Sequence, residues 1–215
     1  MLRKVLFSFA VSFISVSVSA QIQYIIGTGL NASNIRSAQI DSNKTVLGPT
    51  FSFAAIIPVG TLQFKPEVQY SQRGYVIKTG NVGGNINFSS KFKQVINYIE
   101  VPLEIVYPVK TGSGHFMIAA GPVIGFALSG KTTTTLTLVG NRDEKVKNID
   151  FGSGPAQLKS LDYGGRINLM YVFNGGLLLK ADYNYGFSNL SNNNTEQYNT
   201  SIGLGIGYVF GSKKK

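Results

Sequence analysis

Hydrophobic and polar residues alternate along residues 61–107 of this chain, with a Gly- and Asn-rich gap at 79–90. In the first half, one face carries Leu62, Phe64, Pro66, Val68 and Tyr70, and the positions between them are polar or charged. Successive side chains of a strand point to opposite sides, so a period of two predicts β-strands and excludes an amphipathic helix. This stretch therefore predicts two neighbouring strands.

The same alternation recurs along the chain and predicts eight strands. They cover residues 21–35, 45–57, 61–78, 93–107, 115–129, 158–173, 177–190 and 197–210. Long polar links follow the first, third, fifth and seventh of these segments, and short turns follow the second, fourth and sixth. Outer-membrane barrels combine short periplasmic turns with long external loops. We therefore expect an all-β fold, an eight-stranded antiparallel up-and-down transmembrane β-barrel.

The sizes of the residues on the two faces indicate which side turns toward the lumen. One face carries mainly Phe, Tyr, Ile and Leu, whereas the other contains small residues such as Gly27, Gly29, Ala119 and Gly121. The lumen of an eight-stranded barrel barely holds its own side chains. We therefore expect the bulky face to contact lipid. The alternative, a soluble secreted barrel with the bulky face inward, would overfill its lumen.

The short turns fix the pairing of neighbouring strands. A slip of one residue would turn a strand inside out, so each turn must keep the apolar residues on one face. Turns at 58–61, 110–113 and 174–176 meet this condition. They predict three cross-strand pairs, namely Ile57 with Leu62, Tyr107 with Phe116, and Phe173 with Leu177.

Both ends of the chain lie outside the expected barrel. Residues 1–20 start with Arg3 and Lys4, continue with an apolar run and end in small residues, which predicts a signal peptide. A membrane anchor is the alternative, but the run is short and rich in serine. We assign residues 21–211 to the barrel and residues 212–215 to a basic C-terminal tail.

The composition excludes several kinds of site. The chain has no cysteine and a single histidine, His115, so disulfides, thiolate zinc sites and cysteine nucleophiles are excluded. The formal net charge is +10. The Lys and Arg residues are scattered rather than clustered with aromatic residues, and we therefore expect no nucleic-acid partner.

The polar face places nine charged side chains in the expected lumen, four positive and five negative. They are Lys65, Glu67, Arg73, Glu100, Glu104, Asp162, Arg166, Lys180 and Asp182. Buried charges are costly unless they are paired. We therefore expect a structural plug of ion pairs, with Lys65 paired to Glu104 and Asp182 paired to Arg166. A proton or ion path is the alternative.

Candidate catalytic groups are few. Glu100 and Glu104 are neighbouring inward carboxylates of the kind used in acid–base catalysis, but the nearby Lys and Arg residues favour the plug. His115 has no evident partner for a hydrolytic triad. The glycines at 203, 205 and 207 alternate within a strand, unlike a phosphate-binding loop. We expect no enzyme activity, no catalytic, cofactor-binding or metal-binding residues, and no cofactor.

Several short motifs together resemble the PorT-like outer-membrane β-barrel family. They are Lys65-Pro66-Glu67, the QYSQRG of residues 69–74, the NYIEVPL of residues 97–103, Ala120-Gly121-Pro122 and the YNYG of residues 183–186. The resemblance implies a small barrel in the outer membrane of Bacteroidota-type bacteria. It also implies a link to protein secretion, the role of the founding member of that family, and it defines no catalytic residues.

From these observations we expect a protein of the cell outer membrane that acts through external loops or partners, in surface interaction or in support of protein secretion. Outer-membrane lipid, envelope or secretion-system proteins and the barrel-assembly machinery are the expected partners. The last follows from the C-terminal Tyr208-Val209-Phe210, which looks like the signal that this machinery reads. The alternatives are a narrow channel for ions or small solutes and an envelope enzyme acting on lipid or glycan.

Overall fold

The computed structural model describes residues 22–40, 43–81, 88–138, 141–193 and 195–211. The expected signal peptide at 1–20 and the basic tail at 212–215 lie outside the described residues. In the described part of the chain, no helix is long and apolar enough to cross a membrane. The strands in that part are β1 Gln23–Arg36, β2 Asn43–Val59, β3 Leu62–Asn81, β4 Phe88–Thr111, β5 Gly114–Leu138, β6 Asn141–Asn148, β7 Leu161–Phe173, β8 Leu177–Gly186 and β9 Tyr198–Phe210.

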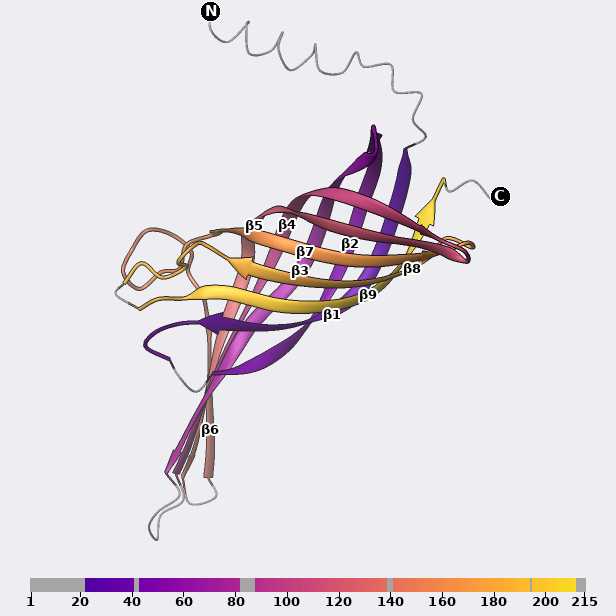
Figure 1. Ribbon diagram of the computed structural model, residues 1–215. Coiled ribbons are helices and arrows are strands. Elements are labelled where there is room, and N and C mark those ends of the chain that lie inside the picture. Colours follow the sequence, from indigo (N-terminus) through magenta and orange to yellow (C-terminus); the bar gives the residue numbers. More distant parts are fainter. Residues whose placement is uncertain (1–21, 41–42, 82–87, 139–140, 194, 212–215) are drawn as a thin grey trace, which may run out of the picture.

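All of these strands except β6 close into a ring of eight, in which each strand is antiparallel to both of its neighbours (Figure 1). Around the ring the order is β4-β3-β2-β1-β9-β8-β7-β5, and β5 returns to β4. Strand β6 pairs with the far part of β5, from Lys131 to Leu138, and stands outside the ring. The predicted eight-stranded antiparallel barrel is confirmed.

Strands β1 and β9 close the ring between the two ends of the chain. Their pairing runs from Tyr24 opposite Phe210 to Arg36 opposite Tyr198. In its middle, Gly27 lies opposite Gly207 and Gly29 lies opposite Gly205. A Cβ atom at Gly29 would overlap the carbonyl oxygen of Leu204. Glycine therefore permits the two backbones to approach more closely here than larger residues would.

The bulky face of the barrel points outward, as the sequence predicts. On β9, for example, the outward Leu204 is 67% exposed, whereas the inward Ser201 is 2% exposed. Aromatic residues gather near the short turns, where Tyr171 contacts both Phe116 and Phe173. The outer surface is thus an apolar wall suited to lipid, and the inner surface is largely polar.

The predicted cross-strand pairs hold at one of the three short turns. Between β7 and β8, Tyr171 lies opposite Leu179 and Val172 lies opposite Leu178. This register agrees with the predicted pair of Phe173 and Leu177 at the turn. At the other two turns the strands extend two residues further than expected, so Ile57 lies opposite Phe64 and Tyr107 lies opposite Ile118. The predicted pairs Ile57–Leu62 and Tyr107–Phe116 are therefore wrong.

The shorter turns explain this difference. Only Gly60 and Thr61 separate β2 from β3, and Gly60 has a φ of 64°, in the left-handed region that favours glycine. Two-residue connections are the commonest in β-hairpins because their twist matches that of the flanking strands. Since the register moves by two residues, every side chain stays on its predicted face.

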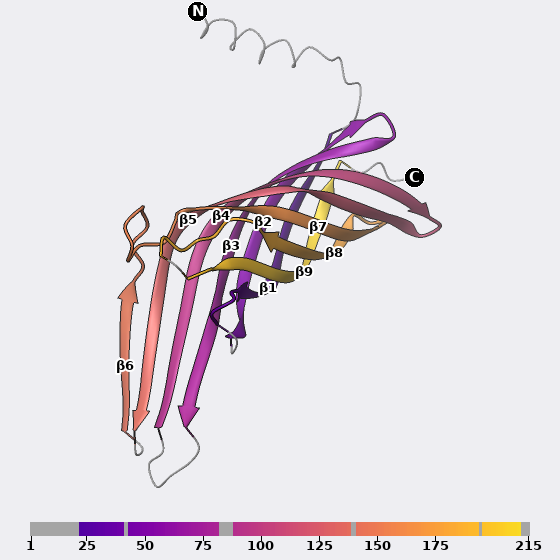
Figure 2. The same ribbon diagram turned by 60° about the vertical axis from the view of Figure 1, so that its left-hand side comes forward.

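The connection expected at 130–156 is largely a sheet. Strand β5 continues to Leu138, β6 folds back along it, and the far parts of β3 and β4 pair beside them. We call these residues, 74–81, 88–97, 130–138 and 141–148, the projecting sheet. Figures 1 and 2 show it extending well beyond the ring. The threonine-rich run of residues 132–138 has a high strand propensity and finds a partner in β4.

The polarity of the two faces inverts where this sheet leaves the barrel. On β3 to β5, its inner face, which continues the lumen side, carries apolar residues such as Ile77 and Phe92, and its outer face, which continues the lipid side, carries lysines. In β5 the change coincides with a β-bulge, at which Tyr98 lies opposite Ala127 but Asn97 lies opposite Ser129. The extra residue, Leu128, shifts the alternation of β5 by one.

Candidate functional site

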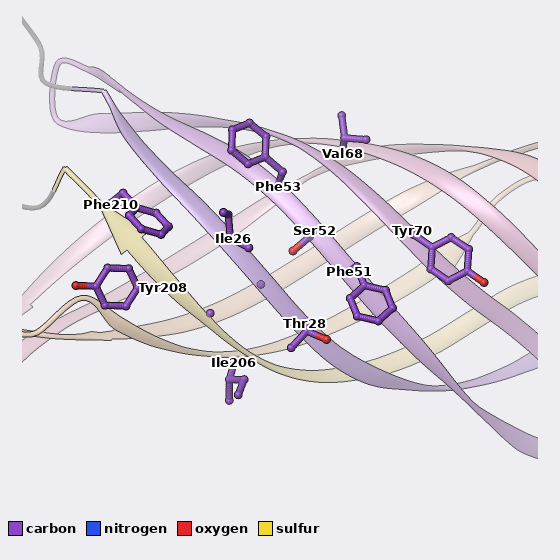
Figure 3. A pocket seen from close by; sticks show the side chains of 12 residues that line it. Ile26, Thr28, Phe51, Ser52, Phe53, Val68, Tyr70, Ile206, Tyr208 and Phe210 are labelled. Carbon is purple, nitrogen blue, oxygen red and sulfur yellow. The ribbon is translucent and has the colours of Figure 1, made fainter.

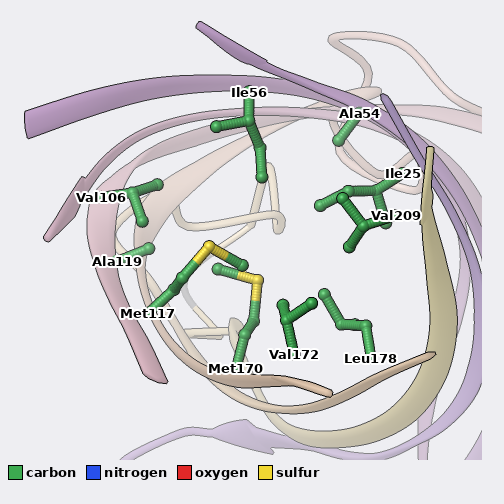
Figure 4. Close-up of a cluster of buried hydrophobic side chains, with 10 residues drawn as sticks. All are labelled: Ile25, Ala54, Ile56, Val106, Met117, Ala119, Met170, Val172, Leu178 and Val209. Atoms are coloured by element: carbon green, nitrogen blue, oxygen red, sulfur yellow. The ribbon is translucent and has the colours of Figure 1, made fainter. Parts of the chain in front are cut away.

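An apolar layer fills the lumen at the end where the short turns lie. The layer contains ten buried side chains from every strand of the ring except β3, drawn in Figure 4. They are Ile25, Ala54, Ile56, Val106, Met117, Ala119, Met170, Val172, Leu178 and Val209. Met117 and Met170 lie opposite each other on β5 and β7, and their thioethers point into the centre. Flexible methionines are suited to filling an irregular gap of this kind.

The sequence reasoning did not identify this apolar layer. Its signal is present in the chain, because both faces of a strand become apolar next to each short turn. Ile56 beside Ile57 on β2 and Val172 beside Phe173 on β7 are examples. A lumen that is polar along its whole length would keep the alternation up to the turn.

A charged layer lies directly above the apolar one, and Lys65 is its first member. The Lys65 ammonium contacts Glu67 Oε2 at 2.5 Å and also contacts Glu104, which lies opposite it on β4. Lys65 is 1% exposed and Glu104 is fully buried. The predicted Lys65–Glu104 pair is present, with Glu67 as a second partner for the same ammonium.

Arg166 connects the charges on opposite walls of the barrel. Its Nη2 lies 3.0 Å from Glu100 Oε2, and its Nη1 lies 3.6 Å from Glu67 Oε1. Glu67 Oε1 also lies 3.6 Å from the Lys180 ammonium, and Glu100 Oε1 lies 2.8 Å from Arg73 Nε. Two glutamates thus bring together four basic residues from β3, β7 and β8.

The predicted ion pair between Asp182 and Arg166 is wrong. Asn184 stands between the two charges, accepting a hydrogen bond from Arg166 Nε at 2.7 Å and donating one to Asp182 Oδ2 at 2.7 Å. The guanidinium instead reaches across the lumen to the glutamates of β3 and β4. Arg166 therefore contacts β8 through Asn184 and the carboxylates of β3 and β4 through its ion pairs.

Asp162 belongs to a separate group nearer the long-loop end. Its carboxylate accepts hydrogen bonds from Ser188 Oγ at 2.5 Å and Asn199 Nδ2 at 2.7 Å. Asn199 also donates to the hydroxyl of the fully buried Tyr98 at 3.3 Å. All nine predicted lumen charges are buried, but Asp162, like Asp182, is held by neutral groups rather than by a cation.

The charged layer leaves little free space. The cavity beside Arg73, Glu100 and Asp162 has a volume of about 10 Å³, close to the minimum of about 10–15 Å³ needed for one water molecule. The apolar layer lies below it, so two layers of buried side chains are stacked in this part of the lumen.

The candidate catalytic residues Glu100, Glu104 and His115 do not form a common site. Glu100 contacts two arginines and Glu104 contacts Lys65, so both carboxylates are engaged by cations. His115 lies beside the turn between β4 and β5, opposite Lys110 and Val172. Among the described residues, no group of three or more His, Cys, Asp or Glu side chains has an arrangement that would hold a metal ion.

The outer wall carries a broad apolar groove across β9, β1, β2 and β3. It has a volume of about 620 Å³ and is lined by Phe51, Phe53, Tyr70, Tyr208 and Phe210 among others (Figure 3). Because this wall faces lipid, the groove is suited to acyl chains. Tyr70 marks its end toward the projecting sheet, where the Tyr70 hydroxyl donates a hydrogen bond to Asn97 Oδ1 at 3.0 Å.

The projecting sheet offers a second surface. Its inner face presents exposed apolar side chains near the tip, where Phe88 lies opposite Leu138 and Leu136 follows on the same face. Phe88 is 40%, Leu136 41% and Leu138 52% exposed. Exposed apolar residues that cluster in this way mark interaction surfaces more often than isolated ones do.

Comparison with solved structures identifies barrels of similar size. Neisserial surface protein A (NspA) has a TM-score of 0.42 and 13% identity, with 86% of this chain and 96% of that chain covered. Ail, the attachment invasion locus protein of Yersinia pestis, crystallised in complex with the heparin analogue sucrose octasulfate, has a TM-score of 0.45 and 16% identity, with 88% and 99% covered. No curated protein matches the chain in sequence.

The family of the outer membrane protein beta-barrel domain matches residues 15–192, which is most of the chain. The match spans β1 to β8 and includes the projecting sheet and all of the buried lumen residues described above except those of β9. With its lipid-facing wall and closed ring, the chain therefore belongs to the outer membrane protein beta-barrel domain family and resides in the outer membrane.

Proposed function

We propose that this protein is a closed, non-catalytic barrel that binds a partner outside the membrane through the inner face of the projecting sheet. The observation that carries the proposal is the exposed apolar cluster Phe88, Leu136 and Leu138, held beyond the lipid-facing band on paired strands. Short turns of outer-membrane barrels lie in the periplasm. The projecting sheet, at the opposite end, then lies at the cell surface.

The closed lumen supports a binding role over a channel. The ion pairs of Glu67 and Glu100 join walls that a conduction path would have to separate. The apolar layer adds a dry barrier of ten side chains. We expect purified protein in planar bilayers to show no stable single-channel conductance, and such conductance would contradict the closed barrel.

The resemblance to PorT-like proteins suggests where to look for the partner. We propose an envelope or secretion-system protein as its class. Within the same proposal, residues 1–20 act as a signal peptide, and the aromatic residues Tyr208 and Phe210 at the end of β9 are read by the barrel-assembly machinery.

The test uses two adjacent serines on β4 that point to opposite faces of the projecting sheet. Ser90 shares the inner face with Leu136, and Ser89 shares the outer face with Thr137. A photoreactive phenylalanine analogue at each position, irradiated in intact cells, reports which face touches another protein. We expect a discrete crosslinked product from position 90 and none from position 89.

A matched variant tests the apolar cluster itself. Phe88→Ser/Leu136→Ser/Leu138→Ser should remove the crosslink from position 90 while the barrel keeps its heat-modifiable migration on gels. If the crosslink persists in that variant, or if position 89 gives the same product as position 90, the inner face is not the binding surface.

A further inference from the structure

We infer that the outer face of the projecting sheet binds the phosphate groups of anionic lipids in the outer leaflet. The site is a basic cluster of Lys44, Lys78, Lys91, Lys93 and Lys131 on four consecutive strands, β2 to β5. This face is the reverse of the one proposed to bind a protein partner. The lipid proposal rests on the cell-surface position of the sheet given above, but it uses the opposite face and is tested by different variants.

The strand register places these lysines together. Lys78 lies directly opposite Lys91, and Lys44 and Lys93 flank the same residue, Val76, from β2 and β4. Lys131 lies opposite Val95, one outward position from Lys93 along β4. Residues opposite each other in an antiparallel pair share a face, with Cβ atoms about 4.5–5.5 Å apart. The cluster is therefore compact.

The cluster is not neutralised by the protein. On the described outer face of β2 to β5, the positions alongside these lysines are Gly, Val, Ser, Asn and Thr. Of the ion pairs within the described residues, none involves any of the five lysines, and the neighbouring Arg142 on β6 is already paired with Glu144 at 2.6 Å. Like charges directly opposite each other destabilise a sheet, so an anion bridging Lys78 and Lys91 would relieve this repulsion.

The position of the cluster matches the headgroup region. On these strands the lipid-facing wall ends in a row of hydrogen-bonded polar side chains. Gln72 Nε2 donates to Asn97 Oδ1 at 3.0 Å, and Asn97 Nδ2 donates to Ser129 Oγ at 3.0 Å. Lys131 is two residues beyond this row, and Lys78 and Lys91 are six beyond it. At about 3.3 Å per residue and a strand tilt near 40°, the lysines stand roughly 5–15 Å above the end of the wall.

The apolar groove continues the same surface into the membrane. Tyr70 lines the groove, and along the outer face of β3 the positions 72, 74 and 76 lead from it to Lys78. A lipid whose acyl chains lie against this wall would carry its headgroup beside the lysines. Lysine side chains reach such groups readily because their long apolar stems lie along the surface.

The experiment measures lipid binding by the full-length protein in a neutral detergent. The probes are bis-phosphorylated lipid A and phosphatidylcholine, detected as bound adducts by native mass spectrometry. Lys91→Gln/Lys93→Gln removes two charges from the cluster, and Lys145→Gln/Lys147→Gln removes two exposed charges from the inner face of the same sheet. Because all four side chains lie outside the barrel wall, we expect each variant to fold. Heat-modifiable migration on gels checks this.

We expect the wild-type protein to bind lipid A in preference to phosphatidylcholine. A lysine near an anionic lipid surface contributes roughly fivefold to affinity, so Lys91→Gln/Lys93→Gln should weaken lipid A binding roughly 25-fold. The inner-face variant should stay within about twofold of wild type. Equal losses in the two variants, equal binding of phosphatidylcholine, or full competition by millimolar inorganic phosphate would each overturn the assignment to a lipid.

Discussion

Replacing Lys65 with methionine removes the cation that joins Glu67 and Glu104 while roughly keeping the volume of the side chain. Glu67 keeps Arg166 and Lys180 at 3.6 Å. Glu104 keeps no cation within 4 Å among the described residues, and it is fully buried beside the apolar layer. The variant therefore creates one uncompensated buried carboxylate at a known position.

The expected loss follows from that burial. Removing one partner of a buried ion pair destabilises a protein by about 3–5 kcal/mol, which lowers the folding equilibrium constant by roughly two to four powers of ten. Lys65→Met/Glu104→Gln removes the orphaned charge, so this double variant should recover much of the loss. Arg142→Ala is the matched control, because the Arg142–Glu144 pair has a similar distance of 2.6 Å but side chains that are 67% and 43% exposed.

The measurement is denaturant unfolding of protein folded in phosphatidylcholine vesicles, with the folded fraction read from gel migration without heating. Arg142→Ala should cost no more than about 1 kcal/mol, as exposed pairs usually do. If Lys65→Met is no more costly than Arg142→Ala, the lumen is hydrated enough to solvate Glu104. The view of the charged layer as a dry structural plug would then be wrong.

Three further variants test other parts of the barrel by the same unfolding assay. Met117→Ala opens a void in the apolar layer, where Met117 is 1% exposed, and should cost about 2–5 kcal/mol; a loss below 1 kcal/mol would mean that the layer is loosely packed. Leu204→Arg places a charge on the lipid-facing wall near the middle of β9 and should cost about 2–4 kcal/mol in vesicles, whereas an unchanged stability would show that this wall does not face lipid. Gly29→Val overlaps the backbone of β9 and should cost at least about 1–3 kcal/mol, while Gly112→Val, in an open turn with no atom near its Cβ position, should be close to neutral.

The strand order and the assignment of faces are predictable because both depend on a local pattern. An alternation with a period of two fixes which side chains share a face, and it does so whatever the length of the turn. The same pattern cannot distinguish two registers that differ by two residues. That is why Ile57 and Tyr107 were paired two positions away from their partners, while every residue of β2 to β5 within the barrel kept its face.

The lumen contacts are only partly predictable. Lys65 and Glu104 are neighbours across one strand pair, so their contact follows from the register. The ion-pair partners of Arg166 lie on β3 and β4, which do not pair with β7, so no strand-pair rule brings them together. They depend on the closed ring and on how far a long guanidinium side chain reaches through it.

The projecting sheet shows a different limit. Residues 130–138 lose the clean alternation of a lipid-facing strand, so the sequence places them in a long connection, although its threonine-rich start is compatible with a strand that continues beyond the membrane. In the structure these residues pair on both sides, with β4 and with β6. Outside the membrane a strand needs no apolar face toward lipid, so hydropathy alone underestimates its length.

The β1–β9 seam has a consequence for how the barrel folds. It joins residues as far apart in the chain as Tyr24 and Phe210, whereas the tight hairpins join residues only a few positions apart. Contacts of such long sequence separation have the largest loop-closure entropy and form slowly. We therefore expect the β1–β9 pairing to form last, so that β1 and β9 are exposed strand edges until then. Its paired glycines present no side chains that would have to be rearranged in the crowded lumen at that final step.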